Sequence, residues 1–143
     1  DYMELSMNEK PMILVVDDEP ANVFFFKGIL EKEGYRVVTA STGAEALTKV
    51  KEEPPALILM DLLLPRLHGF DLLQKLKEDS QYRDIPVVIA TAVYKGSLHR
   101  LEAKRLGAAE FLEKPVDPDV LLETVKNAFT ALSSESTFSL ENE

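Results

Sequence analysis

Three short apolar runs in this sequence each end in an acidic or a hydroxyl residue. The runs and the residues that follow them are 12–16 before Asp17 and Asp18, 56–60 before Asp61, and 86–90 before Thr91. Short, uniformly apolar runs with polar or proline borders are typical of strands buried on both faces of a parallel sheet. One acid in this position would be interpreted as a solvent-facing strand end. The repeated pattern instead favours a shared site, because the carboxyl ends of parallel strands share one edge, where open α/β sheets bind their ligands.

Helical patterns separate these runs from one another and from two further strand patterns. The expected strands are 12–16, 35–39, 56–60, 85–90 and 109–112, and the expected helices are 21–33, 42–51, 70–78, 97–106 and 118–132. Gly34 and Gly107 stand where two of these helices end, as glycine commonly does. Strands that alternate with helices predict an α/β fold around a parallel sheet.

Hydrophobic spacing predicts which helix residues face the core. The residues that share an inward stripe are Phe25, Phe26, Ile29 and Leu30 on the first helix, Phe70, Leu73 and Leu76 on the third, and Val120, Leu121, Val125 and Phe129 on the last. Val23 and Phe24 fall off the stripe of the first helix. We expect these two residues to be exposed and to form a partner-binding surface. The alternative is that Phe24 covers the protein's own core.

Length and composition limit the class of protein. The 143 residues, 45% of them hydrophobic, suit one globular domain, which we place at 10–132. Residues 1–9 are expected to be a flexible extension or a cloning remnant, and 133–143 an acidic, serine-rich tail or linker. Cysteine is absent, which excludes thiol chemistry and is compatible with the cytoplasmic location that we expect. No apolar run is long enough to cross a membrane, no signal peptide is visible, and the formal net charge of −9 argues against nucleic acid as a direct partner.

The acids at the predicted sheet edge form a set of hard oxygen ligands. Asp17, Asp18 and Asp61 have no histidine or cysteine in their pattern, so Mg²⁺ is the ion that they fit best. Thr91, together with Lys114 after the fifth predicted strand, would offer a hydroxyl and a cation to a phosphoryl group. These are the parts of a phosphoryl-transfer site, in which an aspartate can itself be the nucleophile. A glycine-rich phosphate loop is missing from the sequence, which argues against a nucleoside triphosphate as the ligand.

Four motifs in this order and spacing resemble one known family. They are Asp-Asp-Glu at 17–19, Met-Asp-Leu-x-x-Pro at 60–65, Ala-Thr-Ala at 90–92 and Glu-Lys-Pro at 113–115. The sequence over about residues 10–132 is similar to the receiver domain of response regulators in two-component signal transduction systems. The resemblance implies a CheY-like, flavodoxin-like fold, which is a doubly wound parallel sheet of five βα units with strand order 2-1-3-4-5.

The resemblance also implies a role for each acid of the site. Asp61 would accept the phosphoryl group. Asp18, Asp61 and the backbone carbonyl of Leu63 would bind Mg²⁺ directly, and Asp17 would act mainly through water.

Three further residues acquire roles from the same resemblance. Thr91 and Lys114 would hold phosphoryl oxygens. Phe111 matches the aromatic switch position of the family, although it is equally expected as an ordinary core residue. The Lys114–Pro115 peptide bond matches one that is cis in this family, a conformation almost confined to bonds before proline.

The implied function is a phosphorylation-dependent switch. The receiver would take a phosphoryl group from a phosphohistidine of a sensor histidine kinase, or of a histidine phosphotransfer protein in a phosphorelay, onto Asp61. It would act stoichiometrically and would not be an enzyme in the usual sense. Phosphorylation would change the surface formed by the fourth helix, the fifth strand and the last helix, where a downstream effector or a second copy of the receiver would bind.

Two apolar residues depart from the common pattern of the family. Leu63 and Val93, each two residues after a site residue, stand where many members carry a polar side chain, so we expect a long-lived phosphorylated state.

Two other functions are alternatives to the switch. A Mg²⁺-dependent phosphatase is the second hypothesis, but enzymes of that kind generally carry a second acid at the position of Leu63. A receiver-like scaffold that works without phosphorylation is the third, and the intact set of acids with Thr91 and Lys114 counts against it. The sequence identifies neither the kinase nor the output.

Overall fold

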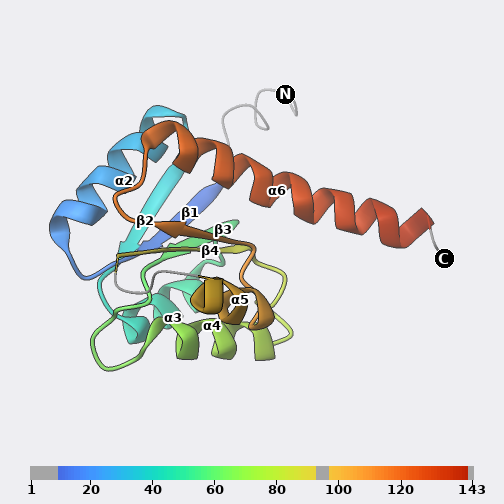
Figure 1. Ribbon diagram of the computed structural model, residues 1–143, viewed down its shortest axis with the longest axis horizontal. Helices are drawn as coiled ribbons and strands as arrows, with labels where there is room; N and C mark the ends of the chain where they lie inside the picture. The colour runs from blue at the N-terminus through green and yellow to red at the C-terminus, as the bar shows by residue number, and fades with distance from the viewer. Residues whose placement is uncertain (1–9, 93–96, 142–143) are drawn as a thin grey trace.

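The computed structural model describes residues 10–92 and 97–141 of the chain (Figure 1). Its strands are β1 (Met12–Val16), β2 (Arg36–Ala40), β3 (Leu57–Met60), β4 (Val87–Thr91) and β5 (Glu110–Glu113). Its helices are α2 (Pro20–Lys32), α3 (Gly43–Glu52), α4 (Gly69–Glu78), α5 (Ser97–Arg105) and α6 (Pro118–Glu141). The strands form one parallel sheet in the order β2-β1-β3-β4-β5. The predicted doubly wound, flavodoxin-like fold is therefore confirmed.

Helices cover both faces of this sheet. α2 and α6 lie on one face, and α3, α4 and α5 lie on the other (Figure 1). Every residue of β1, β3 and β4 is buried, which explains why these strands are apolar throughout and do not alternate with polar residues.

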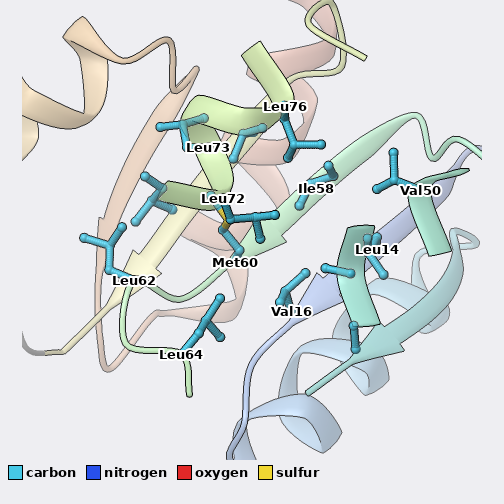
Figure 2. Packing of buried hydrophobic residues seen from close by; sticks show 14 of the residues in the cluster. Leu14, Val16, Val50, Ile58, Met60, Leu62, Leu64, Leu72, Leu73 and Leu76 are labelled. Carbon is cyan, nitrogen blue, oxygen red and sulfur yellow. The ribbon is translucent and has the colours of Figure 1, made fainter. Parts of the chain in front are cut away.

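The buried residues form two clusters, one on each face of the sheet, because successive residues of a strand point to opposite faces. The strand residues of the first cluster are Leu14, Val16, Ile58, Met60, Val87, Ile89 and Phe111, together with Ala40 at the end of β2. Figure 2 shows part of this cluster against Leu72, Leu73 and Leu76 of α4. The strand residues of the second cluster, which packs under α2 and α6, are Ile13, Val15, Leu57, Leu59, Val88 and Ala90. The central strands are thus packed against helices on both faces of the sheet, which fixes the position of their carboxyl ends.

The inward faces of two helices are narrower than the hydrophobic spacing predicts. On α2, Phe26 is buried whereas Phe25 is 41% exposed. On α6, Leu121 is buried whereas Val120 is 48% exposed. Each exposed residue precedes a buried one by a single position, which is about 100° around a helix and turns its side chain out of the contact. The predictions that Phe25 and Val120 lie in the core were therefore wrong.

The remaining predicted core residues are buried or half-buried. They are Phe26, Ile29, Leu30, Phe70, Leu73, Leu76, Leu121, Val125 and Phe129. Of the two residues predicted to be exposed on α2, Phe24 is 82% exposed but Val23 is half-buried.

The ends of the elements agree with the sequence prediction to within about two residues, except at α6. This helix was predicted to end at Leu132 but continues to Glu141, and in Figure 1 it extends well past the sheet. Residues 119–141 contain neither glycine nor proline, so nothing in them breaks a helix. The predicted extension at 1–9 lies outside the described residues. Within residues 10–92 and 97–141, none of the helices has the length and apolar character of a membrane span.

Candidate phosphoryl-transfer site

Asp17 and Asp61 follow directly after two neighbouring strands. β1 and β3 pair in parallel with Val16 beside Met60, so the two acids leave the sheet side by side. The Asp61 N–H donates to the Val16 carbonyl at 3.0 Å, and the Asp17 N–H donates to the Ala40 carbonyl at 3.0 Å. Asp17 is 2% exposed and Asp61 is 9% exposed. The two acids are therefore buried together at the carboxyl edge of the sheet, as the sequence predicts.

Lys114, from the loop after β5, reaches across this edge to both acids. Its Nζ lies 2.7 Å from Asp17 Oδ2 and 2.7 Å from Asp61 Oδ2. Burial by itself would lower the pKa of Lys114, but the hydrogen bonds and the negative charges of Asp17 and Asp61 outweigh it and raise that pKa. The ammonium therefore stays charged, and it offsets the cost of burying two carboxylates next to each other.

The second oxygen of each carboxylate is held by the loop that follows it. The Glu19 N–H donates to Asp17 Oδ1 at 2.9 Å, and the Leu63 N–H donates to Asp61 Oδ1 at 3.1 Å. Both acids are thus fixed in orientation by their own chain. The side chain of Leu63, two residues after Asp61, is 53% exposed. Val93, two residues after Thr91, lies outside the described residues.

Thr91 ends the neighbouring strand β4 and carries an unusual hydroxyl. The residue is fully buried, and within the described residues its Oγ1 has no hydrogen-bond partner. Buried polar groups without a partner are rare, because each costs about 1–3 kcal/mol. The Lys114 N–H donates to the Thr91 carbonyl at 3.0 Å, which ties Thr91 to the lysine that reaches both acids. The hydroxyl is therefore available to bind a group that enters the site.

Asp18 is placed differently from the other two acids. It is exposed, and among the residues that the structure describes no three His, Cys, Asp or Glu side chains gather as a group that could hold a metal ion. The predicted Mg²⁺ site at Asp17, Asp18, Asp61 and the Leu63 carbonyl therefore stays a prediction. The donor set nevertheless fits the ion chemically, because every proposed ligand is an oxygen, from an aspartate or from a backbone carbonyl.

A hollow of about 430 Å³ opens beside these acids, between the start of α2 and the end of β2. Its lining includes Asp17, Asp18, Val23, Phe24 and Lys27. The hollow therefore joins Asp17 and Asp18 to a surface of α2 that carries the exposed Phe24.

The loop between β3 and α4 is shaped by a glycine. A Cβ atom at Gly69 would lie 2.5 Å from the Leu62 Cα and 2.7 Å from the Asp61 carbonyl oxygen, closer than real contacts allow. The Gly69 N–H also donates to the Leu62 carbonyl at 2.8 Å. The close approach of Gly69 therefore sets the path of the chain after Asp61. On the other side of the site, the Lys114–Pro115 peptide bond is cis, as the resemblance implies.

Arg100 of α5 holds Phe111, and the sequence analysis did not identify it. Its guanidinium donates to the Phe111 carbonyl at 3.2 Å, pairs with Glu113 at 3.3 Å and lies 5.3 Å from the centre of the Phe111 ring. Phe111 is only 9% exposed, which confirms its place in the core, and its role as an aromatic switch stays a prediction. An arginine on a highly charged helix carries no signal in the sequence that would single it out.

A second residue that the sequence analysis assigned only to the core also reaches the site. The ring of Phe26 lies 5.8 Å from Lys114 Nζ. Its inward spacing on α2 predicts burial but says nothing of a contact with a residue from the opposite end of the chain.

Comparison with known proteins identifies the family and agrees with the fold. A family model described as the response regulator receiver domain matches residues 13–126. Protein PilH of Pseudomonas aeruginosa is 36% identical over 113 residues, which cover 79% of this chain and 93% of PilH. Response regulator PleD of Caulobacter vibrioides is 41% identical over 115 residues, which cover 80% of this chain but only 25% of PleD. The similarity to PleD thus concerns one part of a longer protein.

Solved structures show the same likeness. The crystal structure of a CheY-like response regulator receiver domain protein from Methanospirillum hungatei superposes with a TM-score of 0.81 at 33% sequence identity and covers 89% of this chain and 99% of that protein. The family model spans most of the chain, and PilH and PleD align with 79% and 80% of it. This chain therefore belongs to the response-regulator receiver domain family.

Proposed function

We propose that this receiver accepts a phosphoryl group on Asp61 from a phosphohistidine of a histidine kinase or a histidine phosphotransfer protein. The observation that carries the proposal is the arrangement around Asp61, whose two oxygens are held by the Lys114 ammonium and the Leu63 N–H. The buried Thr91 hydroxyl at the end of the next strand supports it, because this hydroxyl has no hydrogen-bond partner among residues 10–92 and 97–141. We further propose that the protein acts stoichiometrically as a cytoplasmic signalling switch and is not an enzyme in the usual sense.

The chemistry requires little more than position and charge. An Asp61 carboxylate oxygen attacks phosphorus, the O–P bond forms, the P–N bond to the imidazole breaks, and its electron pair stays with the imidazole. Lys114 offsets the negative charge of the phosphoryl oxygens, and the Thr91 hydroxyl donates to one of them. The low exposure of Asp61 limits the access of water to the acyl phosphate that results.

Receiver domains generally bind Mg²⁺, and we propose that Asp18, Asp61 and the Leu63 carbonyl hold it here, with Asp17 acting through water. The ion would add positive charge where three carboxylates and the phosphoryl oxygens meet. The exposure of Asp18 leaves its oxygens open to an ion that keeps several waters.

Phosphorylation is proposed to act on the surface formed by α5, β5 and α6. A phosphoryl group that accepts a hydrogen bond from Thr91 would draw the end of β4 toward Asp61. Because Thr91 pairs with Glu113 in the register of β4 and β5, and Glu113 pairs with Arg100, the shift would reach the Arg100–Phe111 contact. The result would be a population shift between two states of this surface, which a downstream effector or a second receiver would distinguish.

The phosphodonor is proposed to dock on the exposed face of α2. Phe24 is 82% exposed and Phe25 is 41% exposed, and the hollow beside Phe24 leads to Asp17 and Asp18. Exposed aromatic side chains on a helix are suited to packing against a helical partner.

The direct test is phosphorylation by a small donor such as acetyl phosphate with Mg²⁺. We expect the wild-type protein to take up one phosphoryl group, and the Asp61→Asn variant to take up none. Asp79→Asn, which changes an acid in the loop after α4, is the matched control and should be labelled as the wild type is. Equal labelling of Asp61→Asn would contradict the proposal, and release of many phosphates per protein would indicate a phosphatase.

A further inference from the structure

Lys114 has a third partner that takes no part in the chemistry. Besides Asp17 and Asp61, its ammonium faces the ring of Phe26 at 5.8 Å from the ring centre. This distance is within the range of a cation–π interaction, which strengthens when the cation is shielded from water. Phe26 is 3% exposed, and the Lys114 side chain is 11% exposed, so the contact is shielded.

One acidic partner of Lys114, Asp61, changes during phosphoryl transfer, and Phe26 does not. Once Asp61 carries a phosphoryl group, one of its oxygens is committed to the O–P bond, and the ammonium must turn to a phosphoryl oxygen. Lysine has a long side chain with many rotamers, so its ammonium moves easily to other positions when a partner is removed. A ring fixed in the core keeps its position through both states.

We infer that Phe26 is a positioning residue, whose ring holds the Lys114 ammonium at the site while its bond to Asp61 is exchanged for one to the phosphoryl group. The inference rests on the proposed function, because it concerns how the same lysine serves phosphoryl transfer.

The ring of Phe26 is itself braced from the outer side of α2. Phe25 packs against Phe26 edge to face, with the ring centres 5.6 Å apart and the planes at 63°. Phe25 is 41% exposed. The aromatic pair therefore joins the outer surface of α2 to the lysine in the site.

Site-specific fluorination of Phe26 separates this role from ordinary core packing. Each fluorine weakens the negative potential on the ring face and barely changes its shape. We expect the rate of phosphorylation by acetyl phosphate with Mg²⁺ to fall stepwise with each fluorine, by about fivefold over the series, in line with the strength of a cation–π contact. Phe129, whose ring stacks on Tyr35 at 6.2 Å, is the matched control, and its fluorination should leave the rate unchanged.

A spectroscopic readout reports the contact without any reaction. In the unphosphorylated protein the Lys114 side-chain protons should show the upfield ring-current shift of a cation over an aromatic face. Phe26→Leu should abolish that shift, whereas Phe129→Leu should keep it.

Two results would overturn the inference while leaving the proposed function intact. One is a flat rate across the Phe26 series in a protein that is labelled at Asp61. The other is a fall of the same size in the phosphorylation rate of the Phe129 series, with the rate in both series decreasing in step with the stability of the protein. Failure of the wild-type protein to be labelled at all would overturn the proposed function and this inference with it.

Discussion

Replacing Thr91 by valine should stabilise the protein and weaken its response to phosphorylation. Valine has nearly the shape of threonine, and Thr91 is fully buried with an Oγ1 that has no partner within the described residues. An unsatisfied buried hydroxyl costs about 1–3 kcal/mol, so its removal should raise the free energy of unfolding by about 1 kcal/mol. Most substitutions in a core lower that free energy, which makes the sign of this prediction distinctive.

The same change should remove a hydrogen bond that forms only with the phosphoryl group. A hydrogen bond to a charged oxygen contributes about 1.5–3 kcal/mol, which is roughly ten- to a hundredfold in affinity. Beryllofluoride with Mg²⁺ stands in for the bound phosphoryl group. Thr91→Val should therefore be more stable than the wild type without this ligand and should gain less stability when it binds.

Urea unfolding of both proteins, with and without beryllofluoride and Mg²⁺, measures both effects. Thr48→Val is the matched control, because its hydroxyl already donates to the Ala44 carbonyl at 3.1 Å on the surface and should yield no gain in stability. A Thr91→Val protein that is less stable than the wild type, or that gains as much from the ligand, would refute the reasoning.

Three further predictions concern the surroundings of Asp61. Gly69→Ala should lower the free energy of unfolding by about 1–3 kcal/mol and slow phosphorylation, because the added Cβ would clash with the Leu62 Cα. Urea unfolding measures the first effect, and the rate of labelling measures the second. Leu63→Asn should speed hydrolysis of the phosphorylated protein by about tenfold, because a polar side chain there can orient water, and the decay of phosphoprotein measures this. Phe24→Glu should impair transfer from the kinase but spare phosphorylation by acetyl phosphate, which separate transfer assays would distinguish.

Each of these predictions has a control variant or an outcome that would contradict it. Gly28→Ala lies inside α2, where a Cβ meets nothing within 4 Å, and should stabilise the protein by about 0.5–1 kcal/mol. An equal loss in both alanine variants would remove the steric argument for Gly69. A Leu63→Asn protein that keeps its phosphoryl group as long as the wild type would show that this side chain does not set the lifetime. If Phe24→Glu blocks the small donor as well, that side chain is structural.

The residues at the carboxyl edge of the sheet could be predicted because a local sequence pattern, the end of an apolar run, marks them. Strands buried on both faces are apolar throughout, and the residue at which that pattern stops is the residue that faces the site. Asp17, Asp61 and Thr91 were found in this way. The bounds of β1 were also predicted correctly, because Pro11 and Asp17 mark the two ends of its apolar run.

Contacts between distant side chains could not be predicted in this way. The spacing on α2 selects a face of the helix but does not say how wide the contact is, so Phe25 was placed in the core along with Phe26. The contacts of Phe26 with Lys114 and of Arg100 with Phe111 depend on how whole elements pack. The end of α6 was missed because serine and glutamate were interpreted as a tail, although neither breaks a helix.

Direct mapping of the phosphorylated residue is the sharpest test of the account. The protein would be phosphorylated by acetyl phosphate with Mg²⁺ and treated with borohydride, which reduces the acyl phosphate of aspartate to homoserine. Tandem mass spectrometry of the peptides then locates the altered residue. The account predicts homoserine at position 61 and at no other acid, and none when Lys114 is replaced by methionine. Homoserine at position 17 or 18, or an unaltered Asp61 in the treated wild-type protein, would contradict it.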